Sequence, residues 1–239
     1  MVTSASLAMK ATVEELRPLL TSAGFRKRSH TFNRTVAPGL VHVVNFQMGP
    51  FDPPGTVEIP GLRPNLYGQF AVNLGVFIEE AWRLGIGAFD TDGPPRTKNW
   101  VNEYDCQLRR RVDNLAEDSS TGWWPLDDPG VGPAISDLFQ RDAFVWFDRF
   151  DSRDAIRSAL ENAPTGSRAI SGVTPDRLLA TRMRLGAGDQ GRAQELFDEW
   201  VSHCRSLART EPHVRGHLEY LTGFAAEVGL AMPPADQDG

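Results

Sequence analysis

The spacing of apolar residues predicts a helix at the start of the chain. Leucines recur at helical spacing between residues 16 and 20, and residues 12–15 read TVEE, the pattern of a capping box. Pro18 falls inside this pattern and predicts a kink or an early end. Gly24 has the place of a left-handed stop. We therefore expect one short helix that starts at the capping box and ends before Gly24.

Beyond Gly24 the apolar and polar residues alternate with the period of a β-strand. Pro38 and Gly39 are typical of the turn between the first two strands. The last of the four strands is ambiguous, because its apolar residues would also suit a helix. The expected strands are residues 25–36, 40–48, 69–80 and 103–115.

Two loops interrupt the strands, at residues 49–68 and 85–99. The first is too rich in proline and glycine for regular structure. Loops of this length are uncommon unless they cover or bind something. We expect the first loop to lie over a site.

The second half of the chain changes to helical spacing. Apolar stripes predict two helices between residues 135 and 160, and residues 163–174 read as a linker. Thr174 and Pro175 have the form of a helix start, with the hydroxyl as cap. One stretch resembles a single hairpin of a tetratricopeptide-type repeat, too little for a solenoid. The last three helices are expected near residues 175–185, 190–209 and 212–228.

These elements predict an α+β fold: a four-stranded, mainly antiparallel sheet with flanking helices, plus a C-terminal helical bundle. We expect an α+β domain at residues 1–165, a helical extension at 172–232 and a disordered tail at 233–239. At 239 residues the chain is long enough to bury a core of its own.

The formal net charge of −6 argues against a general nucleic-acid binder, whose affinity comes mainly from neutralising phosphates. No apolar run is long enough to span a bilayer, and the N-terminus lacks the apolar segment of a signal peptide. Cys106 and Cys204 stand far apart and predict reduced thiols. We expect a cytoplasmic protein without membrane contact, and the preference for arginine over lysine indicates a GC-rich bacterial genome.

Residues 186–191 read GAGDQG and match the glycine pattern of dinucleotide-binding loops. Such a site needs a strand before the first glycine, and here the preceding residues have helical spacing. We therefore expect a turn between two helices, and no cofactor.

A weak candidate for a metal site lies near the C-terminus. His213 and His217 would share one helix face, and imidazole with thiolate suits zinc. No carboxylate completes a familiar signature, so our expectation is no metal, with His203, Cys204, His213 and His217 as the residues to check.

Catalytic signatures are missing from the sequence. No GxSxG elbow, HExxH motif or phosphate-binding loop occurs, and no nucleophile has a base that can be named. The catalytic residues are therefore unknown, and a role other than catalysis is favoured.

Polar side chains on the expected strands are the better candidates for a site. Arg109 and Arg111 share one face of the fourth strand, opposite a set of core residues. With Asn45, Gln47 and Asn73 they would form a platform of amides and guanidiniums, groups that suit a planar or anionic ligand. The structural alternative is that these groups only tie down loops and pair with acids.

Two further features complete the candidate site. Arg26, Arg28, His30 and Arg34 would share one face of an unbroken first strand. Trp123 and Trp124 should point opposite ways, one into the core and the other toward the surface, where the ring of Trp124 is a candidate for stacking on a ligand.

Five stretches in order along the chain resemble an uncharacterised bacterial family, a domain of unknown function. They are LRPLLTSAGFRKRSHTFNR, LVHVVNFQ, FAVNLGVF, CQLRRRVDNL and the WW pair. The resemblance covers about residues 7–150, implies no known activity, and leaves the last helices outside. Its pattern falls on Gly24, Phe25, Phe32, Asn45, Gln47, Asn73, Gly75, Cys106, Arg109, Arg111, Trp123 and Trp124.

Two functions remain open. The favoured one is a noncatalytic protein-interaction or binding module, whose partner is another protein. The rival is a domain that binds a small polar molecule, a nucleotide or an anion, with or without catalysis. A ligand site predicts a pocket lined by the five platform residues. An interaction protein predicts that those groups are paired and that an apolar patch is exposed elsewhere.

Overall fold

The computed structural model describes residues 4–50, 66–85, 98–115 and 122–234. Contacts divide the chain into two compact units. Unit 1 comprises Met1–Phe77 and Lys98–Ser152, and unit 2 comprises Ile78–Thr97 and Arg153–Gly239. A compact unit need not fold on its own, so the domains expected at residues 1–165 and 172–232 remain predictions. The loop expected at 49–68 and the tail lie largely outside the described residues.

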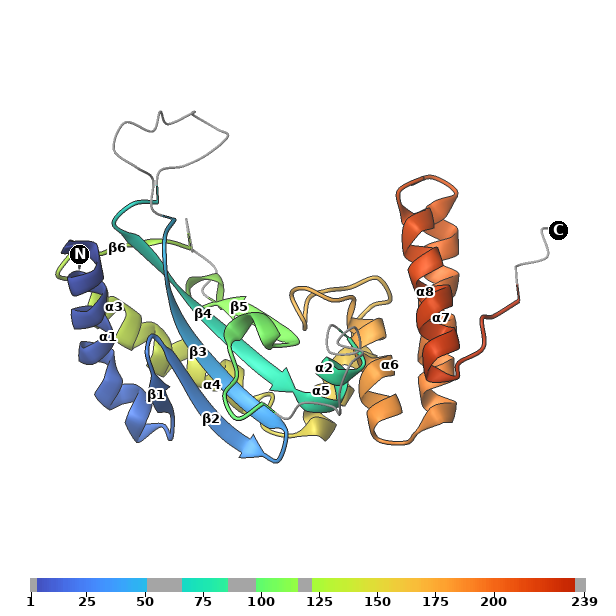
Figure 1. Ribbon diagram of the computed structural model, residues 1–239, viewed down its shortest axis with the longest axis horizontal. Coiled ribbons are helices and arrows are strands. Elements are labelled where there is room, and N and C mark those ends of the chain that lie inside the picture. Colours follow the sequence, from blue (N-terminus) through green and yellow to red (C-terminus); the bar gives the residue numbers. More distant parts are fainter. Residues whose placement is uncertain (1–3, 51–65, 86–97, 116–121, 235–239) are drawn as a thin grey trace. The chain divides into compact units, whose positions relative to one another are not determined.

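Unit 1 is built on an antiparallel sheet, which confirms the α+β class (Figure 1). Its first five strands are neighbours in chain order, and β6 pairs with β4 beside them. The described residues therefore form six strands, not the four expected. The strands are β1 Arg26–Arg28, β2 Thr31–Ala37, β3 Leu40–Met48, β4 Gln69–Ile78, β5 Leu108–Arg111 and β6 Trp124–Pro125.

Two strand predictions need correction. The expected first strand is split into β1 and β2, because Ser29 has a left-handed φ of 57° and turns the chain back on itself. The expected fourth strand shrinks to the four residues of β5, since a single helical turn flanks it on each side, at Glu103–Asp105 and Asp113–Leu115. Its ambiguous spacing therefore reflects a real change of backbone conformation.

Helix α1, Ser4–Ser22, is longer than its sequence signal. The capping box expected at residues 12–15 is wrong: Thr12 lies inside the helix, where its hydroxyl donates to the Ala8 carbonyl at 3.2 Å. Pro18 does not end the helix. Gly24, with a φ of 86°, confirms the expected left-handed stop.

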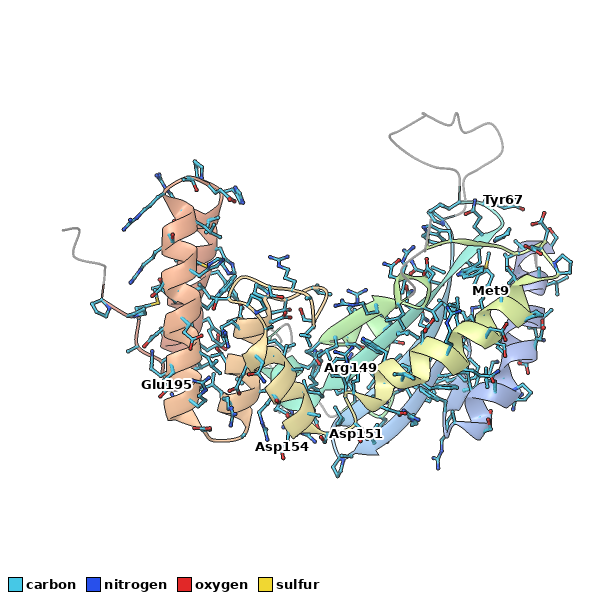
Figure 2. The ribbon with its side chains drawn as sticks, turned by 180° about the vertical axis from the view of Figure 1, so that it is seen from behind. Met9, Tyr67, Arg149, Asp151, Asp154 and Glu195 are labelled. Carbon is cyan, nitrogen blue, oxygen red and sulfur yellow. The ribbon has the colours of Figure 1, made fainter. Side chains whose placement is uncertain are left out.

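One side of the sheet is covered by helices (Figure 2). Helix α3, Val131–Leu138, continues through a π-helical turn, Phe139–Ala143, into α4, Phe144–Asp148, and α1 packs against α3. The side chains under these helices are fully buried. They include Phe32, His42, Val44 and Phe46 from β2 and β3 and Phe70, Val72, Leu74 and Val76 from β4.

The opposite side of the sheet carries most of the polar side chains of the strands, beside a few buried apolar residues such as Val43. The register pairs Thr31 with Asn45 on β2 and β3, and Asn73 with Arg111 on β4 and β5. Gly75 makes room on this side for Cys106, because a Cβ added to Gly75 would lie 2.5 Å from the Cys106 sulfur. We call this side the polar face.

His42 is the polar group buried in the helix-covered core. Its ring stacks on Phe147 with centroids 4.7 Å apart, and it bonds the Phe150 carbonyl at 2.9 Å and the Arg34 guanidinium at 3.0 Å. Because a carbonyl only accepts and a guanidinium only donates, the neutral ring carries its hydrogen on Nε2. Burial lowers the pKa of His42 to about 4, and the hydrogen bond to Phe150 opposes only part of that shift.

Unit 2 is helical, as expected for the C-terminal region. Glu161 joins three of its helices, because its carboxylate accepts from Arg184 at 2.7 Å and from Arg192 at 3.1 Å. The predicted cap at Thr174 is wrong, since Pro175 holds the N-cap position of α6. Its helices are α2 Glu79–Arg83, α5 Arg153–Asn162, α6 Asp176–Gly186, α7 Gln190–Ala208 and α8 Val214–Val228.

None of the helices in the described ranges is both long enough and apolar enough to cross a bilayer.

We predict that His42 makes the protein sensitive to acid. Between pH 6.5 and 4 the unfolded chain binds a proton at this residue that the folded chain does not. The free energy of unfolding should therefore fall by about 1.4 kcal/mol for each pH unit below 6.5 from this group alone. Urea denaturation of the wild type and of His42→Gln at several pH values measures the difference in slope. The control is His213→Gln, which removes a histidine side chain that is 80% exposed; equal slopes in all three proteins would contradict the assignment.

Candidate functional site

The structure brings the three amides of the expected platform together on the polar face. The Asn73 amide nitrogen donates to the Gln47 side-chain oxygen at 2.9 Å and to the Asn45 side-chain oxygen at 3.5 Å. Asn45 in turn donates to the Thr31 hydroxyl at 2.9 Å. Asn73 is buried, Asn45 is half-buried and Gln47 is exposed. A hydrogen-bonded chain thus runs across β2, β3 and β4.

The two arginines of the platform share this face but have other partners. Arg109 holds both carboxylate oxygens of Glu103, at 2.5 and 3.0 Å, and this ion pair raises the pKa of Arg109. Arg111 donates to the Gly122 carbonyl at 2.9 Å and lies over the Trp123 ring. The geometry of these two arginines therefore fits the structural alternative, in which they pair with acids and tie down loops.

The two tryptophans, Trp123 and Trp124, lie against opposite faces of the sheet, and both are only partly buried. Trp123 lies under the Arg111 guanidinium, whereas Trp124 pairs with Phe70 at the start of β4. The Trp124 indole nitrogen has no hydrogen-bond partner within the described residues. The register places Trp124 on the same face as the core residue Phe70, but neither indole is fully buried or fully exposed.

A cavity of about 590 Å³ opens on the polar face. It includes two of the five platform residues, Asn45 and Gln47, while Asn73, Arg109 and Arg111 do not line it. The turn between β1 and β2 forms one wall, and a segment ahead of β5 forms another. Its lining residues are Arg28, Ser29, His30, Thr31, Asn45, Phe46, Gln47, Trp100 and Asn102.

The described residues of the lining carry positive charge and hydrogen-bonding groups, and none of them is a carboxylate. Arg28 is exposed and has no ion pair with any described residue. Burial lowers the pKa of His30, and the charge of Lys27 lowers it further, so His30 is neutral at pH 7. The cavity therefore presents one fixed positive charge among amides and hydroxyls.

Sequence reasoning found part of this site and missed the rest. It placed Arg34 with Arg26 and Arg28, but the turn at Ser29 shifts the pattern, and Arg34 lies in the helix-covered core beside His42. Trp100 and Asn102 were missed, because they precede β5 in an irregular segment without periodicity. The only available signal was an aromatic residue followed by an amide next to the basic strand.

The other candidate motifs form no site. The glycines at 186–191 join α6 to α7, with Gly188 at a φ of 77°, so this segment is the helix-to-helix turn that was expected. The described residues hold no group of three or more His, Cys, Asp or Glu side chains that could bind a metal ion. His217 instead accepts a hydrogen bond from Trp200 at 3.2 Å, and Cys204 is buried, which raises its pKa to about 11.

Comparison with known proteins adds one match. Residues 61–147 match the family model of a domain of unknown function (DUF4304), which confirms the expected resemblance for this part of the chain. The match includes β4, β5 and Asn73 but not Asn45 or Gln47. No curated protein and no solved structure matches the chain.

We predict that the Arg109–Glu103 pair stabilises the fold. The Glu103 side chain is only 10% exposed and Arg109 is 34% exposed, so a double-mutant cycle of Glu103→Gln and Arg109→Gln should give a coupling of about 1–2 kcal/mol. The control is the less buried pair Glu79–Arg83 within α2, whose side chains are 25% and 40% exposed, with an expected coupling of about 0.3–0.5 kcal/mol. Urea denaturation measures both cycles, and equal couplings would refute the structural role.

Proposed function

We propose that the protein is a noncatalytic protein-interaction module of the bacterial cytoplasm, and that it binds its partner at the cavity on the polar face. The observation that carries this proposal is the open cavity itself. Its lining has exposed Arg28 and Gln47 beside the half-buried ring of Trp100. Arginine and aromatic residues are the groups most enriched at binding hot spots.

The chemistry of the lining supports a role without catalysis. Arg28 and His30 are its only titratable side chains, and no carboxylate, thiol or lysine lies beside them in the described cavity. In the catalytic triads that use a histidine as acid and base, a second group orients its ring and stabilises its protonated form. A neutral histidine among amides can donate and accept hydrogen bonds, as recognition requires.

Both cysteines support a reducing compartment. Cys106 and Cys204 are free thiols and are buried. Burial raises the pKa of each, and buried thiols of this kind are inert packing groups.

A small polar or anionic ligand is the alternative, favoured by the cavity volume, which falls within the range of small-molecule pockets. Such pockets usually enclose most of the ligand and are lined mainly by apolar groups. Here Arg28, Ser29 and Gln47 are exposed, and Phe46 is the one fully buried apolar residue of the lining. An exposed polar rim beside a half-buried aromatic ring is more typical of a protein interface.

A photocrosslinker tests the proposal. We replace Trp100 by p-benzoylphenylalanine, an aromatic residue of similar size, and irradiate living cells of the natural host. One defined polypeptide should be attached at this position. The matched control replaces Val145, which is 57% exposed on α4, on the helix-covered side of the sheet.

The expected result is a product from position 100 that position 145 does not give, and that Arg28→Gln abolishes. The same products from both positions, or no protein product from position 100, would contradict the proposal. Native mass spectrometry of the same preparations identifies a bound metabolite, which would establish the alternative.

A further inference from the structure

The hydrogen bonds of the cavity wall leave mainly donors unused. Asn73 donates both amide hydrogens, one to Gln47 and one to Asn45. The side-chain oxygens of Gln47 and Asn45 therefore already accept a hydrogen bond. The Thr31 oxygen likewise accepts from Asn45. Each of these acceptors that borders the cavity is already engaged from within the sheet.

The hydrogen-bond donors of Gln47 and Thr31 are not used within the sheet. The Gln47 amide nitrogen and the Thr31 hydroxyl hydrogen have no acceptor within the described residues. The Arg28 guanidinium adds up to five further donors. Gln47 is held by its oxygen, so its two N–H groups are directed away from Asn73. The wall thus offers donors to whatever enters the cavity.

Acidic neighbours among the described residues neutralise several other cations of unit 1, but neither Arg28 nor Arg26, and of these two only Arg28 lines the cavity. Lys98 pairs with Asp105 at 2.6 Å, Arg109 with Glu103, and Lys27 with Glu14 at 3.0 Å. Arg28 has no such partner among the described residues. Arg28 is the one charged side chain among the described residues of the lining, which are therefore complementary to a single negative charge.

We propose that the cavity binds the carboxylate of an aspartate or glutamate side chain from the partner protein. The Arg28 fork takes the two carboxylate oxygens, and the Gln47 amide and Thr31 hydroxyl satisfy their remaining lone pairs. The ring of Trp100 covers the apolar flank of the bound residue. This assignment rests on the proposed function and specifies its ligand.

One positive charge favours a carboxylate over a phosphate. A phosphate monoester carries close to two negative charges at pH 7 and is usually held by several cations. The described lining has one. A guanidinium and a carboxylate match in charge and in planar two-pronged geometry.

A peptide titration tests the inference. The probes are the peptides acetyl-Gly-Asp-Gly-amide and acetyl-Gly-Asn-Gly-amide, with succinate and inorganic phosphate as competing anions. The observed signals are the side-chain amide of Gln47 and the indole of Trp100 in nitrogen-15 spectra of the full chain. The aspartate peptide should bind at least about tenfold more tightly than the asparagine peptide, because it alone accepts charged hydrogen bonds.

The strand itself supplies the matched control. Arg26 and Arg28 are both exposed on β1, two residues apart, but only Arg28 lines the cavity. Arg28→Gln should weaken aspartate-peptide binding about tenfold or more, whereas Arg26→Gln should change it less than about twofold. Urea midpoints for both variants verify that the fold is retained.

Three outcomes would overturn the inference: equal losses in the two arginine variants, equal binding of the two peptides, or tighter binding of succinate or phosphate than of the aspartate peptide. If the crosslinker at position 100 captures a partner while the aspartate peptide fails to bind, the carboxylate assignment falls and the proposed function stands. If the peptide binds but no partner is captured, the proposed function falls.

Discussion

The antiparallel register between β2 and β3 is the constraint on which the rest of unit 1 depends. Thr31 lies opposite Asn45 and Phe32 lies opposite Val44, so the aromatic residues of both strands face the helices, whereas Thr31 and Asn45 face the other side. A slip of one residue would exchange the two faces and expose the core. The same register that seals the core therefore assembles the amide chain and the cavity.

Burial of polar groups divides the polar face into two parts. Arg109 and Arg111 each have a partner in the described chain, the Glu103 carboxylate for the first and the Gly122 carbonyl for the second. In the part that contains Arg28 and Gln47, the side-chain donors of these two residues have no acceptor among the described residues. Buried polar groups need hydrogen-bond partners within the protein, whereas exposed donors at the rim of a cavity can bond to water until a partner binds. The first part stabilises the fold, and the second is suited to recognition.

Much of the fold could be predicted from the sequence, because periodicity reports burial directly. The helices α6, α7 and α8 and the strand β4 lie close to their predicted ranges. The site was predicted only in part. Alternation placed the amides and arginines on one face, but it could not tell that Glu103 neutralises Arg109, since their pairing depends on a turn with no periodic signal. It also missed the left-handed Ser29, which moves Arg34 to the core and brings Arg28 to the cavity.

We propose that Arg28 at the cavity, and not the general charge of β1, holds a partner protein. Native mass spectrometry of the untagged chain, isolated gently from its natural host, tests this most directly when the wild type is compared with Arg26→Gln and Arg28→Gln. We expect a second polypeptide bound to the wild type and to Arg26→Gln and absent from Arg28→Gln. A chain that keeps the same polypeptide after Arg28→Gln, or that carries a small molecule in place of a polypeptide, would contradict it.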